Sequence, residues 1–573
     1  MPPKVADSTA GVSVPGQTPR MELARLLVWH TIVWPCATLV LATLLFWVGT
    51  PIGPFHLWIG LLTSVALSIW AGVEWRASVK AVGALLSVAL PAALALEWAY
   101  DFSGDGQLYH LPGVLALAQG WNPFLNPRLA DWNAAFEQAL PIAGTYVQHY
   151  AKGAWIVGAA IYRGTGLLEA AKLLNLLFMW AVYIVAAQAG RQAGLGPLLS
   201  RAAAVAVAAN PIALYQATSF FIDGQVASLY TLLLLLSIEH FRRPDTRLLG
   251  QIAAIVVLLA ELKFTGLVYA GFVGASLSAL AWMNGWRRPI LAYLMVGSIS
   301  LALAVIVAGF QPYVTNVLQH GNPFYPAIGR EDGRNIQYKE ASPEFLAKNR
   351  VEKLVRSVFS ESGLGGYPRW KVPFAVQKTE LYAFFDAGPR VGGFGPMFGG
   401  LLVTALILFA LAWPSLPRKA RHWAGAIASV ITLSTLLNPE AWYARLAPQL
   451  WLLPLLLLAC TLLSTSNWMR RAAIVAIVAM IGNAVLVGAL NWGRTIQKNV
   501  EFREQIAILQ EATRRDPVQV TFHPLFRFVT EHRLRKYSIP YVAVETADCE
   551  TPRPFSYPNS MVCLPCGKCE PHR

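Results

Sequence analysis

Charged residues are scarce in this chain. Only 13% of its 573 residues are Asp, Glu, Lys or Arg, whereas 55% are hydrophobic and the mean hydropathy is +0.46. A soluble globular protein carries about 25% charged residues, so the composition excludes that class. The first 20 residues lack the features of a signal peptide. They are rich in Pro, Gly, Ser and Thr, and we expect residues 1–20 to form a disordered cytoplasmic tail.

The hydrophobic residues are grouped in blocks of about 20, the length that crosses a bilayer as a helix. The blocks lie at residues 26–49, 56–73, 79–98, 168–189, 199–215, 223–240, 247–262, 264–283, 289–309, 396–413, 421–437, 446–463 and 471–490. They predict an all-α polytopic membrane protein with roughly thirteen transmembrane helices. Two of these helices lie in residues 21–78, and the others form a larger transmembrane region over residues 79–490.

The basic residues indicate how these helices are oriented. Every second connection between the blocks contains Lys or Arg, as at Arg242, Arg243 and Arg247. Such connections lie in the cytoplasm by the positive-inside rule. The net charge of +15 therefore reflects topology, and we expect no nucleic-acid partner. The outer side then holds two large loops, residues 99–167 and 310–395, and a C-terminal appendage, residues 491–573.

The appendage has a mixed α/β pattern, with a charged helix expected over residues 496–515 and strands over 518–522 and near 541–544. Its four cysteines are Cys549, Cys563, Cys566 and Cys569. In an oxidising compartment they would form two disulfides. A zinc site made by the last three is the alternative.

The first outer loop begins with two carboxylates and a histidine where an apolar block ends: Asp101, Asp105 and His110. Charge at that depth is usually functional. Further along, Leu129, Trp132, Phe136 and Leu140 recur at helical spacing and predict an amphipathic helix on the membrane surface. Residues 153–162 are apolar but too short to span, so we expect them to enter the outer leaflet and return.

Several short motifs on the outer side resemble those of a known protein family. They are Asp105 with Tyr109-His-Leu-Pro112, then Gly120-Trp-Asn-Pro123, Gly321-Asn-Pro-Phe-Tyr-Pro326, and Trp442-Tyr-Ala-Arg445-Leu-Ala-Pro448. Together, over residues 79–490, they resemble bacterial membrane glycosyltransferases of the GT-C fold. The resemblance implies a multi-pass protein of the bacterial inner membrane, with its N-terminus cytoplasmic and its C-terminus periplasmic. It also implies transfer of a sugar from a polyprenyl-phosphate carrier to a lipid, glycan or protein acceptor, with inversion.

In that reaction a carboxylate can take the proton of the attacking hydroxyl, and Asp105 best matches the motif position. Asp101 could share the base role, orient the acceptor, or bind a divalent cation such as Mg or Mn together with Asp105. Otherwise no cofactor is expected. The alternative is that the two Asp residues only shape a turn.

The leaving phosphate needs cations. Lys263 lies in a tight outer hairpin and Arg445 precedes an apolar block, so both are expected to bind the phosphate. The alternatives are a local ion pair with Glu261 or snorkelling to the lipid headgroups for Lys263, and an ion pair with Glu440 for Arg445.

Further residues could bind the substrates. They are Tyr109, His110, His149, Lys152, Asp223, His320, Asn322 and Tyr325. The alternatives are a packed histidine beside Trp121 for His110, a helix cap for Asp223, and interfacial anchors for the residues between His320 and Tyr325.

Three other functional classes stay open. A flippase or transporter of lipid-linked sugars would place ionisable groups near mid-bilayer and often has repeated halves. Here the charges lie at the outer boundary, and the Asp101 segment is not repeated. A polymerase or ligase of lipid-linked surface glycans would share an outer site. A nonenzymatic assembly factor would have no reason to gather carboxylates and cations in one cavity.

Overall fold

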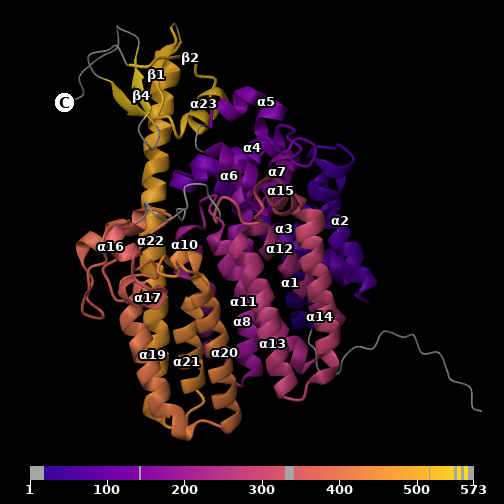
Figure 1. The fold of residues 1–573 in the computed structure, drawn as a ribbon. Helices are drawn as coiled ribbons and strands as arrows, with labels where there is room; N and C mark the ends of the chain where they lie inside the picture. Colours follow the sequence, from indigo (N-terminus) through magenta and orange to yellow (C-terminus); the bar gives the residue numbers. More distant parts are fainter. Residues whose placement is uncertain are drawn as a thin grey trace, which may run out of the picture.

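Helices make up nearly all of the regular structure, as expected where lipid offers no partners for backbone N–H and C=O groups. The computed structural model describes residues 19–140, 143–328, 341–514, 516–546, 552–555 and 560–564. The helices form a bundle, and the strands lie together beyond one of its ends (Figure 1).

Each predicted span falls on a helix. The helices are α1 (Pro19–Trp47), α2 (Phe55–Trp70), α3 (Trp75–Trp98), α8 (Leu173–Gln192), α9 (Pro197–Ala208), α11 (Asp223–Arg242), α12 (Thr246–Leu262), α13 (Phe264–Met283), α14 (Arg287–Ala302), α19 (Phe398–Ala412), α20 (Arg418–Leu437), α21 (Leu452–Thr461) and α22 (Asn467–Ala512). In the part of the chain that the structure describes, eight helices are long and apolar enough to cross a bilayer. The chain is thus helical and membrane-like, and the total of thirteen spans stays a prediction.

The block at 199–215 is not one helix, contrary to the prediction. Helix α9 ends at Ala208, and a short helix, α10 (Pro211–Tyr215), follows. The break arises because Pro211 cannot continue α9, while the Asn210 side chain accepts a bond from the Ile212 N–H and caps α10.

Helix α22 joins two elements that were expected to be separate. It contains 46 residues and runs from the apolar block at 471–490 through the charged helix without interruption. Figure 1 shows it leaving the bundle and carrying the strands at its far end. At about 1.5 Å per residue it is about 69 Å long.

The appendage at the end of α22 is a four-stranded sheet in the order β2-β1-β4-β3. The strands are β1 (Val518–Thr521), β2 (Tyr541–Ala543), β3 (Arg553–Phe555) and β4 (Ser560–Cys563), and α23 (Arg527–Lys536) connects β1 to its parallel neighbour β2. The two predicted strands are confirmed, whereas α23, β3 and β4 were not anticipated. Cys563 is disulfide-bonded, so it is not a zinc ligand. Cys549, Cys566 and Cys569 lie outside the described residues.

The first outer loop folds into short helices: a π-helical turn (Gly106–His110), α4 (Leu111–Ala118), α5 (Leu129–Gln138), α6 (Ala143–His149) and α7 (Gly153–Thr165). The predicted amphipathic helix corresponds to α5, which is kinked at Asn133, and its apolar side contacts protein. Leu129 and Phe136 are buried, and the Phe136 ring packs against Phe528 of α23 with centroids 4.5 Å apart. Helix α7 is also buried, against α4 and α2.

Candidate functional site

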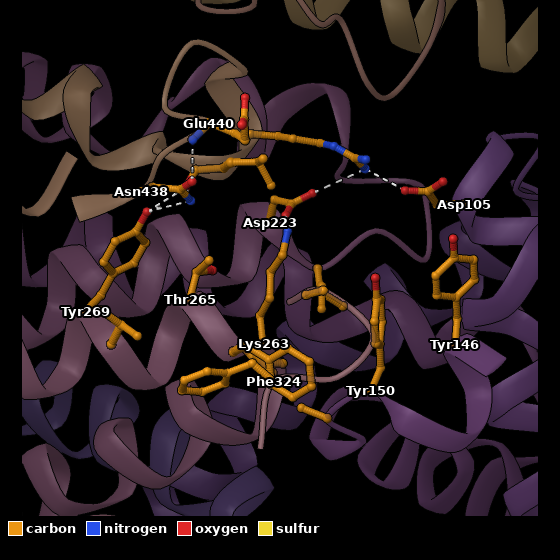
Figure 2. Close-up of a pocket in the computed structure, with 18 of the residues that line it drawn as sticks. Asp105, Tyr146, Tyr150, Asp223, Lys263, Thr265, Tyr269, Phe324, Asn438 and Glu440 are labelled. Atoms are coloured by element: carbon orange, nitrogen blue, oxygen red, sulfur yellow. Dashed lines mark hydrogen bonds and ion pairs between the residues drawn. The ribbon is translucent and has the colours of Figure 1, made fainter. Parts of the chain in front are cut away.

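A cavity of about 400 Å³ lies at the end of the bundle where α11 and α13 begin. Six of the predicted residues line it, namely Tyr109, His110 and the four charged residues Asp105, Asp223, Lys263 and Arg445. Figure 2 shows the labelled Asp105, Asp223 and Lys263 side chains close together there. The sequence motifs therefore converge in space, although up to 340 residues separate them along the chain.

Chain topology brings these four residues together. Asp105 immediately precedes the π-helical turn, Asp223 begins α11, and Lys263 is the single residue between α12 and α13. Arg445 lies in a short 3₁₀ turn before α21. Helix α11 ends at Arg242, so the cavity lies at the opposite end of this helix from the basic connection.

The four side chains form a row of alternating charge. Nη1 of Arg445 is 2.7 Å from Oδ2 of Asp105 and 3.8 Å from Oδ2 of Asp223. Lys263 Nζ donates to the other oxygen of Asp223. Neither cation follows the alternative interpretation: Lys263 does not pair with Glu261, and Glu440 pairs instead with Lys353, at 3.0 Å.

The Arg445 guanidinium is held between two rings, with its carbon 4.9 Å from the Phe221 centroid and 4.6 Å from that of Tyr443. Its Nε is buried and has no hydrogen-bond partner among the residues that the structure describes. A planar, fixed guanidinium with a spare donor is suited to an oxyanion such as phosphate.

Asp105 is held as a carboxylate. Burial alone would raise its pKa, but the Arg445 guanidinium, with smaller contributions from His110 and Lys263, lowers the pKa below its ordinary value. The Tyr109 hydroxyl also donates to Oδ2 of Asp105, at 3.2 Å. Asp105 therefore carries charge in the cavity and has one strong cationic partner.

His110 lines the same cavity, but packs against Trp155 and not Trp121. Trp155 Nε1 donates to His110 Nδ1 at 2.8 Å. Burial lowers the pKa of His110 to about 4. The ring is thus neutral near pH 7, and because Nδ1 accepts, its proton resides on Nε2, which is left as a hydrogen-bond donor.

Asp223 does not cap α11, because the helix already begins at Asp223 and the capping residue is Ile222. Its carboxylate instead accepts from Lys263 and from Gln216 Nε2, the latter at 3.1 Å. Gln216 in turn accepts from the Gly224 N–H at 2.9 Å. The role of Gln216 was missed, since a glutamine inside an apolar stretch gives no signal of its own.

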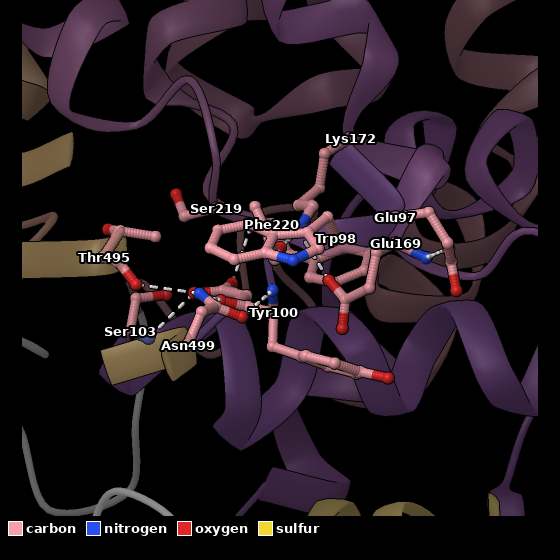
Figure 3. Close-up of polar contacts among 12 residues, drawn as sticks. Glu97, Trp98, Tyr100, Ser103, Glu169, Lys172, Ser219, Phe220, Thr495 and Asn499 are labelled. Carbon is pink, nitrogen blue, oxygen red and sulfur yellow. Dashed lines mark hydrogen bonds and ion pairs between the residues drawn. The ribbon is translucent and has the colours of Figure 1, made fainter. Parts of the chain in front are cut away.

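Asp101 does not line the cavity. Its two oxygens each accept a backbone N–H at 2.7 Å, from Ser103 and from Phe220. Figure 3 shows Ser103 and Phe220 with the buried Lys172–Glu169 pair beside them. Burial raises the pKa of Asp101, opposed by Lys172 and these N–H groups. The carboxylate therefore ties two loops together away from the cavity, and these contacts do not support its predicted share in the base role.

The same bonds argue against a divalent cation shared by Asp101 and Asp105. The Asp101 oxygens are satisfied by backbone donors, and Asp105 faces Arg445. Across the described ranges, no three His, Cys, Asp or Glu side chains are grouped as metal ligands. These residues do not fit a metal.

Replacing Asp101 by Asn is expected to destabilise the fold more than it slows any reaction. An amide oxygen can replace one acceptor, but its NH₂ group would face a backbone N–H. The loss is about 1–3 kcal/mol of the free energy of unfolding. Thermal unfolding in detergent measures it. An unchanged unfolding temperature together with a large loss of activity would indicate that Asp101 takes part in the reaction.

The remaining predicted residues lie outside the cavity. Lys152 Nζ donates to the backbone oxygens of Gln148 and Tyr150, both at 2.8 Å. His149 bonds to Asn316 at 2.8 Å, and His320 stacks on Tyr325 with centroids 3.7 Å apart.

Asn322 stabilises its own turn by accepting from the Phe324 N–H and donating to the Ile328 oxygen. The segment still contributes to the cavity, through Phe324, Ala327 and Ile328.

Other cavity residues carried no predicted role. They are Tyr146, Tyr150, Tyr269, Asn438 and Glu440, among the residues drawn in Figure 2. Asn438 and Glu440 lie just before the motif that runs from Trp442 to Pro448.

Comparison of the chain with protein-family models, with curated proteins and with solved structures gives no match. The GT-C family thus stays a prediction from the motifs.

Proposed function

We propose that this chain is a GT-C-type glycosyltransferase of the bacterial inner membrane. It moves a hexosyl or pentosyl group from a polyprenyl-phosphate carrier to a lipid, glycan or protein acceptor at the outer face, with inversion. One observation carries the proposal: two carboxylates and two cations alternate in one cavity, at the end of α11 opposite its basic connection. In this topology the N-terminus is cytoplasmic and the appendage periplasmic.

The cavity offers a group for each charge that develops in the reaction. An acceptor hydroxyl loses its proton to Asp105 as its oxygen attacks the anomeric carbon, and the carrier phosphate leaves with the electrons of the broken C–O bond. Arg445 and Lys263 stabilise that phosphate. His110, through Nε2–H, can donate to a sugar hydroxyl or to the phosphate.

The apolar part of the cavity suits the lipid part of the donor. Val268 on α13 and Leu437 on α20 both line the cavity, and these residues are 42% and 43% exposed. An isoprenoid chain can pass between them into the bilayer while its phosphate stays beside Arg445. This arrangement supports a lipid-linked donor over a soluble nucleotide sugar.

The ion pair between Asp105 and Arg445 makes Asp105 a weak base before the donor binds. A donor phosphate competes for the same guanidinium and weakens the pair. Once the ion pair with Arg445 is weakened, the effect of burial dominates. Burial raises the pKa of Asp105 toward that of an effective base. The donor therefore activates the base, and we expect the donor to bind before the acceptor reacts.

Proteoliposomes containing the protein test the function. They are given radiolabelled polyprenyl-phosphate sugars or polyprenyl-diphosphate sugars, with a cell-envelope extract on the outer side. The expected result is a labelled acceptor and free polyprenyl phosphate, from the monophosphate donors only. Release of polyprenyl diphosphate would identify a polymerase or ligase, and movement of donor across the bilayer without transfer would identify a transporter.

A further inference from the structure

Helix α23 of the appendage contains an arginine that is almost completely buried. Arg533 is 1% exposed, and its guanidinium lies among the rings of Tyr100, Phe102 and Phe502, at 5.4, 4.8 and 5.6 Å from their centroids. Two of these rings belong to the segment that begins the first outer loop. The arginine therefore enters the neighbourhood of the proposed site from a separate part of the chain.

Its hydrogen bonds reach both ends of the segment that carries Asp105. Nη2 of Arg533 donates to the backbone oxygen of Asp101 at 2.6 Å, and Nη1 donates to Oε1 of Gln107 at 3.0 Å. Asp105 lies between these two contacts. We call the bonds from Arg533 to Asp101 and Gln107 the arginine clamp.

Other contacts hold the residues just before the clamp. The hydroxyls of Tyr100 and Tyr537 are 2.7 Å apart, and Lys536 pairs with Glu97 at 2.8 Å. Asn499, on α22, accepts from the Tyr100 N–H at 2.8 Å, and Figure 3 shows these two residues meeting. The segment is thus held by contacts with α22 and α23, and also by the Phe220 N–H, which donates to the Asp101 carboxylate.

If the appendage only stabilised the bundle, apolar contacts would be enough to hold it there. Burying a guanidinium costs free energy that hydrogen bonds must offset, whereas apolar side chains of similar size avoid that cost. A guanidinium, unlike an apolar side chain, also fixes geometry. Its donors lie in one plane, so they set the positions of two acceptors relative to each other.

We propose that Arg533 is a positioning residue for Asp105, and that the appendage fixes the backbone from Asp101 to Gln107 so that Asp105 meets both Arg445 and the acceptor. This inference rests on the proposed function for its catalytic meaning. The claim that Arg533 fixes the backbone from Asp101 to Gln107 does not depend on which reaction takes place in the cavity.

Mobility of the segment is measured directly with a nitroxide spin label on Gly104→Cys. Gly104 is exposed, and a Cβ there meets no atom within 4 Å. The free cysteines Cys36 and Cys460 are replaced by Ala in this background. Arg533→Met is expected to sharpen the spectrum of the label. Arg535→Met, two residues along the same helix, changes a side chain that is 66% exposed and pairs with Glu531 at 2.9 Å. This variant is expected to leave the spectrum unchanged.

Transfer rates are measured on the same variants without the label. A displacement of about 1 Å can cost about a hundredfold in rate, so Arg533→Met is expected to lower kcat by about 10- to 100-fold. The KM for the donor should change little, because Arg445 and Lys263 are untouched. Gln107→Ala removes the acceptor of one of the two clamp bonds and should also increase the mobility of the label. It tests the clamp independently if Arg533→Met folds poorly.

An immobile label and an unchanged kcat in folded Arg533→Met and Gln107→Ala proteins would overturn the inference. If the parent protein transfers no sugar, the proposed function fails, while the label still decides whether the clamp fixes the segment.

Discussion

Replacing Asp105 by Asn is expected to lower the rate of sugar transfer by about 10²- to 10⁴-fold, the usual contribution of a general base. The amide has nearly the same size and can still accept from Arg445 and Tyr109, which now bond to Oδ2 of Asp105. It cannot take a proton from the acceptor hydroxyl. Initial rates in proteoliposomes with a saturating donor measure the effect.

Asp131→Asn is the matched control for this experiment. Asp131 lies in the same outer loop, on α5, and its side chain is 44% exposed in a surface pair with Arg128. This variant should retain full activity. Rates near those of the wild type for a folded Asp105→Asn protein would remove Asp105 from the mechanism.

Replacing Arg445 is the second change with a large expected effect. Arg445→Lys keeps the charge but loses the planar donors that reach Asp105 and Asp223, so we expect kcat/KM to fall by about 10²- to 10³-fold. Arg445→Met removes the charge as well and should lower it further. Arg128→Met, at an exposed arginine of the first outer loop, is the control.

The Arg445 variants also predict a change in pH dependence. A base works only when deprotonated, so activity is lost as the pH falls through its pKa. Arg445 holds the pKa of free Asp105 below its ordinary 3.8, so the acidic limb of kcat/KM lies below that value. In Arg445→Met, burial is no longer opposed by this cation, and the limb should move to higher pH. A limb that stays in place would show that Arg445 does not control Asp105.

Much of the bundle follows from the sequence because lipid imposes a simple rule: apolar blocks of sufficient length become helices. Each predicted block is helical for this reason. The break at Asn210 was missed because Ala208 to Tyr215 is apolar throughout except for that Asn and the Pro after it. The continuity of α22 was missed because the change from apolar to charged residues marks the edge of the lipid and not the end of the helix.

The charged residues of the site could also be predicted, since a carboxylate or cation beside an apolar block is costly unless it has a role. Asp105, Asp223, Lys263 and Arg445 were found in this way. Which residues pair could not be predicted, because Arg445 meets Asp105 through contacts between segments 340 residues apart. For the same reason the backbone role of Asp101 was hidden.

Because helix α22 is unbroken, the number of residues in it determines where α23 lies relative to the first outer loop. About 32 Å of it, at 1.5 Å per residue, lies between Asn491 and the end of the helix at Ala512. One residue inserted there would turn everything beyond it by about 100°, and would swing α23 away from the first outer loop. Seven residues would restore the rotational phase but lift the sheet by about 10 Å. The length of this helix therefore sets both the rotation and the height at which α23 meets Asp101 and Gln107.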